Sequence, residues 1–220
     1  MCESLINGHM GSQRLAFTSD GVTCEGVFVC PDEIVSAPGL VVCHPHPLYG
    51  GDMENNVVRG LTEAFAAAGF AILRFNFRGV GRSTGHYGEG IGEQEDAKAA
   101  LAWLAAQPGV DADRLFLAGY SFGARVTLAV AATDPYLFGF IAVAPPALYG
   151  EWPSMVSSRG PKIFLCGDSD PYAPPEVLMG LVDSLPEPKR LVLFPNTDHF
   201  FVGQERMLGQ HALKLVQELS

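Results

Sequence analysis

The sequence lacks the features that mark several large classes of protein. No run of 18 apolar residues occurs, and no apolar segment of a secretory signal stands at the N-terminus, so a membrane-spanning helix or a signal peptide is not predicted. The five cysteines are scattered, odd in number and never spaced C-x-x-C, which argues against a disulfide framework or a structural zinc site. We therefore expect a soluble, cytoplasmic protein.

Basic residues are also scarce. The 14 Lys and Arg are outnumbered by 24 Asp and Glu, which gives a net charge of −10 and argues against nucleic acid or an anionic membrane surface as a partner. With 48% hydrophobic and 17% charged residues, a chain of 220 residues can bury a large core. Residues 8–12, GHMGS, look like a cloning remnant. We expect residues 1–12 to be a tag or disordered and residues 13–220 to form a single domain.

Apolar runs typical of buried strands alternate with helical segments along the chain. Asp20-Gly21 between two extended segments predicts a hairpin. Alternating strands and helices predict right-handed β-α-β units, hence an α/β fold with a mostly parallel sheet, an antiparallel N-terminal hairpin and helices on both faces. The predicted strands are 14–19, 22–30, 40–43, 70–77, one from 115, 138–143, 162–166 and 190–194, and the predicted helices are 55–68, 92–107, one through 131, 175–184 and 204–219.

One motif joins a predicted strand to a predicted helix. G-Y-S-F-G at 119–123 fits G-x-S-x-G, in which glycines on either side let the chain turn so sharply that the Ser121 hydroxyl projects free. A serine nucleophile needs a base, and the base needs an orienting acid. Asp170 and His199 follow later strands, in the order Ser, Asp, His. Because the carboxyl ends of parallel strands meet at one edge of the sheet, we expect the three side chains to lie together.

These motifs, with G-D-S-D-P at 167–171 and D-H-F-F at 198–201, resemble the α/β-hydrolase superfamily from residue 14 onward. Two further segments, H-P-H-P-L-Y-G-G at 44–51 and R-F-N-F-R-G-V-G-R-S-T-G at 74–85, are similar to a small, lidless bacterial branch close to dienelactone hydrolases. Dienelactone hydrolases carry cysteine at the elbow, whereas this chain carries Ser121. That departure favours hydrolysis of ordinary esters or thioesters.

The resemblance implies a role for each member of the triad. Ser121 would be the nucleophile, His199 the general base and then the general acid, and Asp170 the group that orients His199. Asp168 competes with Asp170 for the last role, and the family spacing G-x-x-D selects Asp170.

The resemblance also implies an oxyanion hole made of backbone N–H groups. The first would come from Phe122, directly after the nucleophile, and the second from Leu48 or Tyr49 in the loop after the third strand. Aromatic side chains in the loops are expected to rim an apolar pocket that suits acyl or aryl groups. The candidates are Tyr49, Tyr120, Trp152, Tyr172 and Phe200.

The sequence indicates no cofactor and no metal. His44 and His46 have the H-x-H spacing of a metal pair, but prolines interrupt the strand and no third ligand is evident, so we interpret both imidazoles as bracing the loop. The loop 78–85 lacks the lysine of a phosphate-binding loop and the third glycine of a dinucleotide fingerprint. Arg78 and Arg82 are expected to pair with local carboxylates, with an anionic substrate as the alternative partner.

The sequence thus predicts a serine hydrolase that cleaves small carboxylic esters or thioesters through an acyl-enzyme. Two alternatives stay open. The same triad would serve an amidase or small peptidase, and the same fold could belong to a non-catalytic protein that binds a ligand or partner. The sequence leaves open whether the protein is a monomer or a homodimer, and which ester it cleaves.

Overall fold

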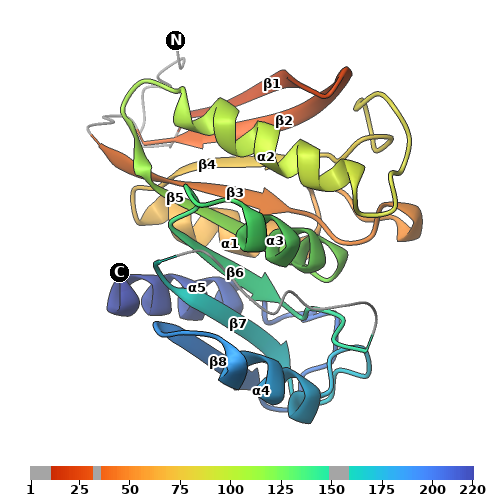
Figure 1. The fold of residues 1–220 in the computed structure, drawn as a ribbon, viewed down its shortest axis with the longest axis vertical. Helices are drawn as coiled ribbons and strands as arrows, with labels where there is room; N and C mark the ends of the chain where they lie inside the picture. The colour runs from red at the N-terminus through yellow and green to blue at the C-terminus, as the bar shows by residue number, and fades with distance from the viewer. Residues whose placement is uncertain (1–10, 32–35, 149–158) are drawn as a thin grey trace.

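The computed structural model describes residues 11–31, 36–148 and 159–220. Across these ranges eight strands form one sheet in the order β1-β2-β4-β3-β5-β6-β7-β8. The pairs β1–β2 and β2–β4 are antiparallel and the remaining neighbours are parallel, which confirms the predicted fold class (Figure 1). The strands are β1 (Gly11–Ser19), β2 (Val22–Cys30), β3 (Ala37–Cys43), β4 (Ala71–Phe75), β5 (Val110–Tyr120), β6 (Gly139–Val143), β7 (Lys162–Gly167) and β8 (Lys189–Phe194).

The hairpin forms where the sequence predicts it. Asp20 and Gly21 both have positive φ, 40° and 77°, as a tight turn between twisted antiparallel strands requires. β1 begins three residues before its predicted start, and Gly11 pairs with Cys30. The sequence analysis expects residues 1–12 to be a tag or disordered, but Gly11 and Ser12 are part of the sheet.

Helices cover both faces of the sheet (Figure 1). The helix α1 (Asn56–Ala67) packs closely with α5 (Glu205–Leu219) on one face, and α2 (Gly92–Ala105) lies with α3 (Phe122–Thr133) on the other, where α4 (Pro175–Ser184) covers the end near β8. Side chains of β5 alternate between the two cores: Phe116 and Ala118 face α1 and α5, while Leu115 and Leu117 face α2 and α3. Burial on both faces explains the continuous apolar runs.

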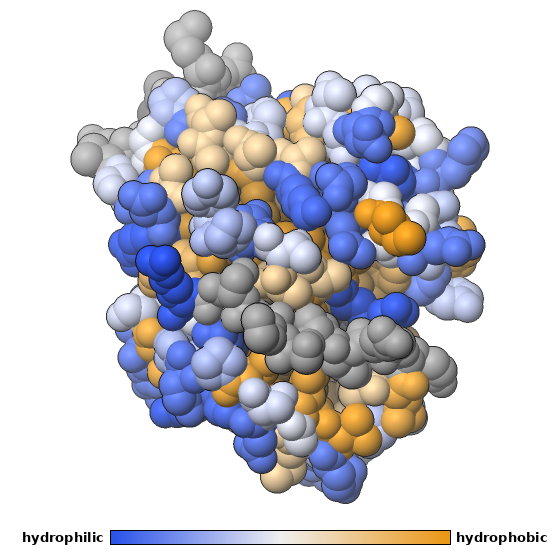
Figure 2. Space-filling model, in the orientation of Figure 1, coloured by the Kyte–Doolittle hydropathy of each residue, from blue (hydrophilic) through white to orange (hydrophobic). Residues whose placement is uncertain are grey.

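The outer surface is mixed in polarity. Figure 2 shows hydrophilic side chains around most of the outline and a hydrophobic area over α4, whose exposed side chains include Val177 and Met179. In the parts of the chain that the structure describes, no helix has the length and apolar character needed to cross a membrane.

Candidate active site

Ser121 lies at the turn from β5 into α3 and has a strained backbone. Its φ is 55° and its ψ is −113°, a region that residues other than glycine rarely occupy. A side chain at Gly119 would collide with the carbonyl oxygen of Gly123, and one at Gly123 would collide with that of Cys43. The two glycines of the motif are therefore required by close backbone packing, and the turn leaves Ser121 partly exposed.

The structure brings the three predicted triad residues together. His199 Nε2 lies 2.9 Å from Ser121 Oγ, and His199 Nδ1 lies 2.8 Å from Asp170 Oδ2. Since a carboxylate only accepts hydrogen bonds, Nδ1 carries the proton of the neutral ring and Nε2 is left to accept the Ser121 hydroxyl. This is the arrangement that a serine nucleophile needs.

Backbone groups fix the Asp170 carboxylate after β7. Its Oδ1 accepts the N–H groups of Tyr172 at 2.8 Å and Ala173 at 3.1 Å, which leaves Oδ2 for His199. The competing Asp168 points elsewhere and accepts the hydroxyl of the neighbouring Ser169, which lowers the pKa of Asp168. The carboxylate that meets the histidine is therefore the one selected by the G-x-x-D spacing.

Tyr120 does not lie at the rim, contrary to the sequence prediction. Only 3% of its surface is exposed, its ring packs in the core beside α1 and α5, and its hydroxyl donates to the carbonyl oxygen of His199 at 2.8 Å. The physical reason is strand alternation, since Tyr120 shares a face of β5 with the buried Phe116 and Ala118. Tyr120 thus anchors the loop that carries His199 to the core.

The predicted oxyanion donors differ in their surroundings. Among the described residues the N–H of Phe122 has no acceptor. The N–H of Leu48, in contrast, donates to His46 Nδ1 at 3.2 Å, and that of Tyr49 donates to the His46 carbonyl oxygen at 3.1 Å. The His46 N–H itself meets no acceptor in the described part of the chain. Sequence reasoning passed over this group, although prolines on both sides of His46 make its N–H one of the few in the loop.

His44 braces the loop after β3, as the sequence analysis interprets it. Its ring is completely buried, lies 2.6 Å through Nδ1 from the Pro45 carbonyl oxygen, and accepts the Phe77 N–H through Nε2 at 3.1 Å. Burial lowers the pKa of His44 to about 4. Both ring nitrogens are therefore engaged by backbone groups, which leaves neither to bind a metal.

Aromatic side chains flank the triad histidine and the loop. The rings of Tyr172 and Phe200 lie 4.8 and 5.6 Å from the ring of His199, and both side chains are substantially exposed. Tyr49 is 85% exposed and lies 4.6 Å from the ring of His46. Trp152 is outside the described residues. Of the predicted pocket residues that the structure describes, Tyr49, Tyr172 and Phe200 make the entrance to the site apolar.

An ion pair anchors the loop after β4, as expected for Arg78. The Arg78 guanidinium donates to the buried Asp96 carboxylate, with Nη2 2.8 Å from Oδ1, and these hydrogen bonds raise the pKa of Arg78. The Arg78 backbone N–H also donates to Asp96, at 2.9 Å. Asp96 belongs to α2, so this pair ties the loop to the helix and leaves the arginine no free charge for a substrate.

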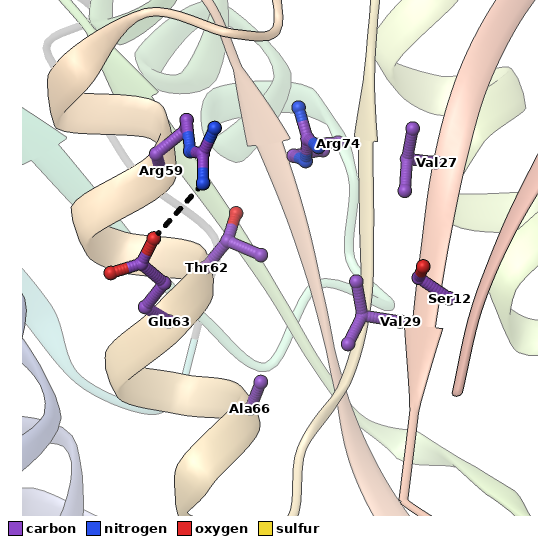
Figure 3. Close-up of a pocket in the computed structure, with 8 residues that line it drawn as sticks. All are labelled: Ser12, Val27, Val29, Arg59, Thr62, Glu63, Ala66 and Arg74. Carbon is purple, nitrogen blue, oxygen red and sulfur yellow. Dashed lines mark hydrogen bonds and ion pairs between the residues drawn. The ribbon is translucent and has the colours of Figure 1, made fainter. Parts of the chain in front are cut away.

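A separate pocket of about 300 Å³ lies between α1 and the strands β1, β2 and β4 (Figure 3). Its cations are already paired: Arg59 lies 3.4 Å from Glu63, and Arg74 lies 2.7 Å from Glu54. None of its lining residues belongs to the triad or to the loop 44–51. The pocket is therefore not part of the candidate active site.

Comparisons with known proteins give the family of the chain and agree with its fold. A family model described as X-Pro dipeptidyl-peptidase (S15 family) matches residues 20–154. An α/β serine hydrolase homologue from Coxiella burnetii is 34% identical, with a TM-score of 0.83 over 94% of this chain and 97% of that one. An α/β serine hydrolase without a lid from Xanthomonas campestris is 32% identical, with a TM-score of 0.83 over 99% and 98% of the two chains.

An uncharacterized protein from Rickettsia prowazekii is 34% identical over 175 residues, which are 76% of this chain and 73% of that protein. The family model covers more than half of the chain, and the structural likeness extends over nearly all of it. The chain therefore belongs to the α/β-hydrolase superfamily, as a hydrolase of the serine type in the family described as X-Pro dipeptidyl-peptidase (S15 family).

Proposed function

We propose that the protein hydrolyses small carboxylic esters or thioesters through an acyl-enzyme. The observation that carries the proposal is the continuous hydrogen-bonded chain from Ser121 Oγ through His199 to the buried Asp170, with separations of 2.9 and 2.8 Å. Ser121 stands partly exposed at a strained elbow, where an incoming carbonyl carbon can reach it.

The proposed reaction has two halves. Ser121 Oγ attacks the carbonyl carbon while its proton passes to His199 Nε2, and Asp170 stabilises the resulting imidazolium. The imidazolium then gives that proton to the departing alcohol or thiol, which leaves the acyl group on Ser121. A water molecule, deprotonated by His199, attacks the acyl-enzyme, and the returned proton restores the Ser121 hydroxyl.

We assign the oxyanion to two backbone N–H groups, those of Phe122 and His46. Both are free of acceptors among the described residues, and the two side chains pack together with ring centroids 4.9 Å apart. The N-terminus of α3 adds the positive end of its dipole beside Phe122. A donor of this kind stabilises the transition state by about 3 kcal/mol.

The apolar mouth supports a substrate with an acyl or aryl group. Tyr172 and Phe200 lie against the triad histidine, and Tyr49 lies on the opposite loop. The description of the matched family, a dipeptidyl-peptidase, supports amide hydrolysis as the second candidate. The buried thiols of Cys24, Cys43 and Cys166, which form no disulfide among the described residues, support a reducing compartment such as the cytoplasm.

The test is hydrolysis of p-nitrophenyl esters from acetate to octanoate by the wild type and by Ser121→Ala. We expect the substitution to lower kcat by about 10⁴-fold or more, because it removes the nucleophile. Amide hydrolysis is measured beside it with p-nitroanilides of the same acyl groups and with an X-Pro p-nitroanilide.

If the X-Pro anilide is hydrolysed faster than the esters, the protein is a peptidase and the esterase proposal is wrong. Equal rates for the wild type and Ser121→Ala would remove Ser121 from the mechanism. An inert wild type that a fluorophosphonate does not label at Ser121 would favour a binding protein on this fold.

A further inference from the structure

We infer that the imidazole of His46 is a positioning residue that fixes the second oxyanion donor, its own backbone N–H, by accepting the Leu48 N–H at Nδ1. The inference rests on the proposed function, since it concerns the oxyanion hole of the same site. It begins from the 3.2 Å hydrogen bond between Leu48 N and His46 Nδ1.

Three hydrogen bonds of the loop converge on His46. Its side chain caps the short 3-10 helix η1 (Pro47–Tyr49) by accepting the Leu48 N–H, and its carbonyl oxygen accepts the N–H groups of Tyr49 and Gly51, each at 3.1 Å. These bonds hold the peptide groups that follow His46. With the two prolines lacking an N–H, the His46 N–H is left free to meet a negatively charged oxygen.

The imidazole is also held from its other side. Its ring packs against the rings of Tyr49, Tyr87 and Phe122, with centroids 4.6, 5.2 and 4.9 Å away. Phe122 supplies the first proposed donor, so the imidazole connects the two donor segments. A shift of the His46 ring would therefore move the loop relative to Phe122.

The loop of Tyr87 is itself fixed by a buried carboxylate. Glu93 accepts the N–H groups of Gly88 and Gly90, each at 2.8 Å. The Tyr87 hydroxyl then lies 3.4 Å from His46 Nε2. The position of the imidazole is thus set by contacts from three separate segments of the chain.

These contacts require the neutral ring. Leu48 N–H can only donate, so Nδ1 must keep its lone pair, and Nε2 carries the proton toward the Tyr87 hydroxyl oxygen. Burial and the positive charge of Arg125 lower the pKa of His46, and Glu93 opposes them by raising it. The neutral, cap-forming state is therefore the one populated at neutral pH.

The test compares His46→Leu with His46→Asn, since both keep the backbone N–H. Leucine fills the space without an acceptor, whereas asparagine supplies a favoured capping acceptor. We expect His46→Leu to lower kcat/KM for a p-nitrophenyl ester by about 10- to 100-fold, the range for a misplaced donor. His46→Asn should lie between His46→Leu and the wild type, because the cap is kept while the ring contacts are lost.

A second readout separates positioning from general damage to the fold. An alkyl trifluoromethyl ketone adds to Ser121 and forms a tetrahedral oxyanion, so its inhibition constant should rise in His46→Leu by the same factor as kcat/KM falls. The matching secondary alcohol forms no oxyanion, and its inhibition constant should stay unchanged. The control is His86→Leu, which makes the same change at an exposed histidine with no side-chain partner among the described residues.

Each outcome decides the inference. It falls if His46→Leu keeps wild-type kcat/KM, if His46→Asn is as impaired as His46→Leu, or if the alcohol and the ketone weaken alike. A higher kcat/KM in His46→Leu would also overturn the inference, because the cap would then be keeping the Leu48 N–H from acting as an oxyanion donor. Should His46→Leu not fold, His46→Ala removes the same acceptor without added bulk. A wild type inert toward all the esters would remove the proposed function itself, and this inference with it.

Discussion

His44 is a buried histidine whose hydrogen bonds suit only the neutral ring. Its Nε2 accepts the Phe77 N–H at 3.1 Å, so a proton on that nitrogen would face another proton. Burial lowers the pKa of His44 to about 4 from an ordinary value of 6.5. Between these values the unfolded chain binds a proton at this position that the folded chain does not bind.

This residue should make the protein sensitive to acid. Because the pKa of His44 is lower in the folded state than in the unfolded state, its contribution to the free energy of unfolding is fully present above pH 6.5. This contribution is lost as the pH falls toward about 4. The loss from this residue approaches about 1.4 kcal/mol for each pH unit. His44→Gln offers an acceptor that does not titrate, so it should lack this slope. Urea unfolding of the wild type and of His44→Gln from pH 7.5 to 4.5 measures the free energy of unfolding of each protein. If the difference between the two free energies stays constant with pH, the prediction is contradicted.

At the residue level, the sequence predicted the three triad residues. It did not predict that Tyr120 is buried or that the Leu48 N–H is engaged in a hydrogen bond. Ser121, Asp170 and His199 were predictable because each follows a strand, and strand ends meet at one edge. The burial of Tyr120 could have been predicted from its even spacing with Phe116, but its position inside the motif, beside Ser121, led to the prediction that it rims the pocket. The bond that engages the Leu48 N–H depends on a side-chain rotation that no sequence pattern encodes.

Among the elements, α1 and α5 pack backbone against backbone at two glycines. A side chain at Gly209 would collide with the carbonyl oxygen of Gly60, and a Cβ at Gly60 would lie 2.5 Å from the carbonyl oxygen of Glu205. The two helices therefore touch through their backbones at this point. By contrast, nothing lies within 4 Å of a Cβ added at Gly180 in α4.

Alanine at these glycines should have opposite effects. Gly180→Ala should raise the free energy of unfolding by up to about 1 kcal/mol, because alanine favours the helix and meets no neighbour. Gly209→Ala gains the same helix propensity but should lower the free energy of unfolding by about 1–3 kcal/mol, because the helices must separate. Chemical denaturation at pH 7 measures both. If Gly209→Ala is as stable as Gly180→Ala, the close contact does not constrain the fold.

The positions of the strands and helices along the chain were largely predictable from the sequence. The order of the strands in the sheet was not. Apolar periodicity places α4 at its observed bounds and β2 at its observed bounds. β5 begins at Val110, five residues before its prediction, because its first residues are partly or fully exposed and lack an apolar pattern. The order that sets β4 between β2 and β3 depends on pairing between distant segments, which local patterns do not report.

For the molecule as a whole, the parallel sheet assembles a site from distant parts of the chain. Ser121 and His199 are 78 residues apart in sequence and meet because β5 and β8 end at the same edge. In the described residues the connection from β6 to β7 contains no helix over this edge. Ser121 is partly exposed, and the exposed Tyr172 and Phe200 stand beside its histidine.

The partial exposure of Ser121 predicts catalysis without interfacial activation. A lipase with a closing helix gains activity when its substrate forms an interface, because the interface stabilises the open state. Here no described element must move before Ser121 meets a dissolved ester, so the rate on tributyrin should follow a single saturation curve through the solubility limit. The measurement is titration of released butyrate across that limit, beside a lid-bearing lipase as control. A jump in rate at the onset of emulsion would mean that a segment covers the triad in solution, and the site would then have to be treated as gated.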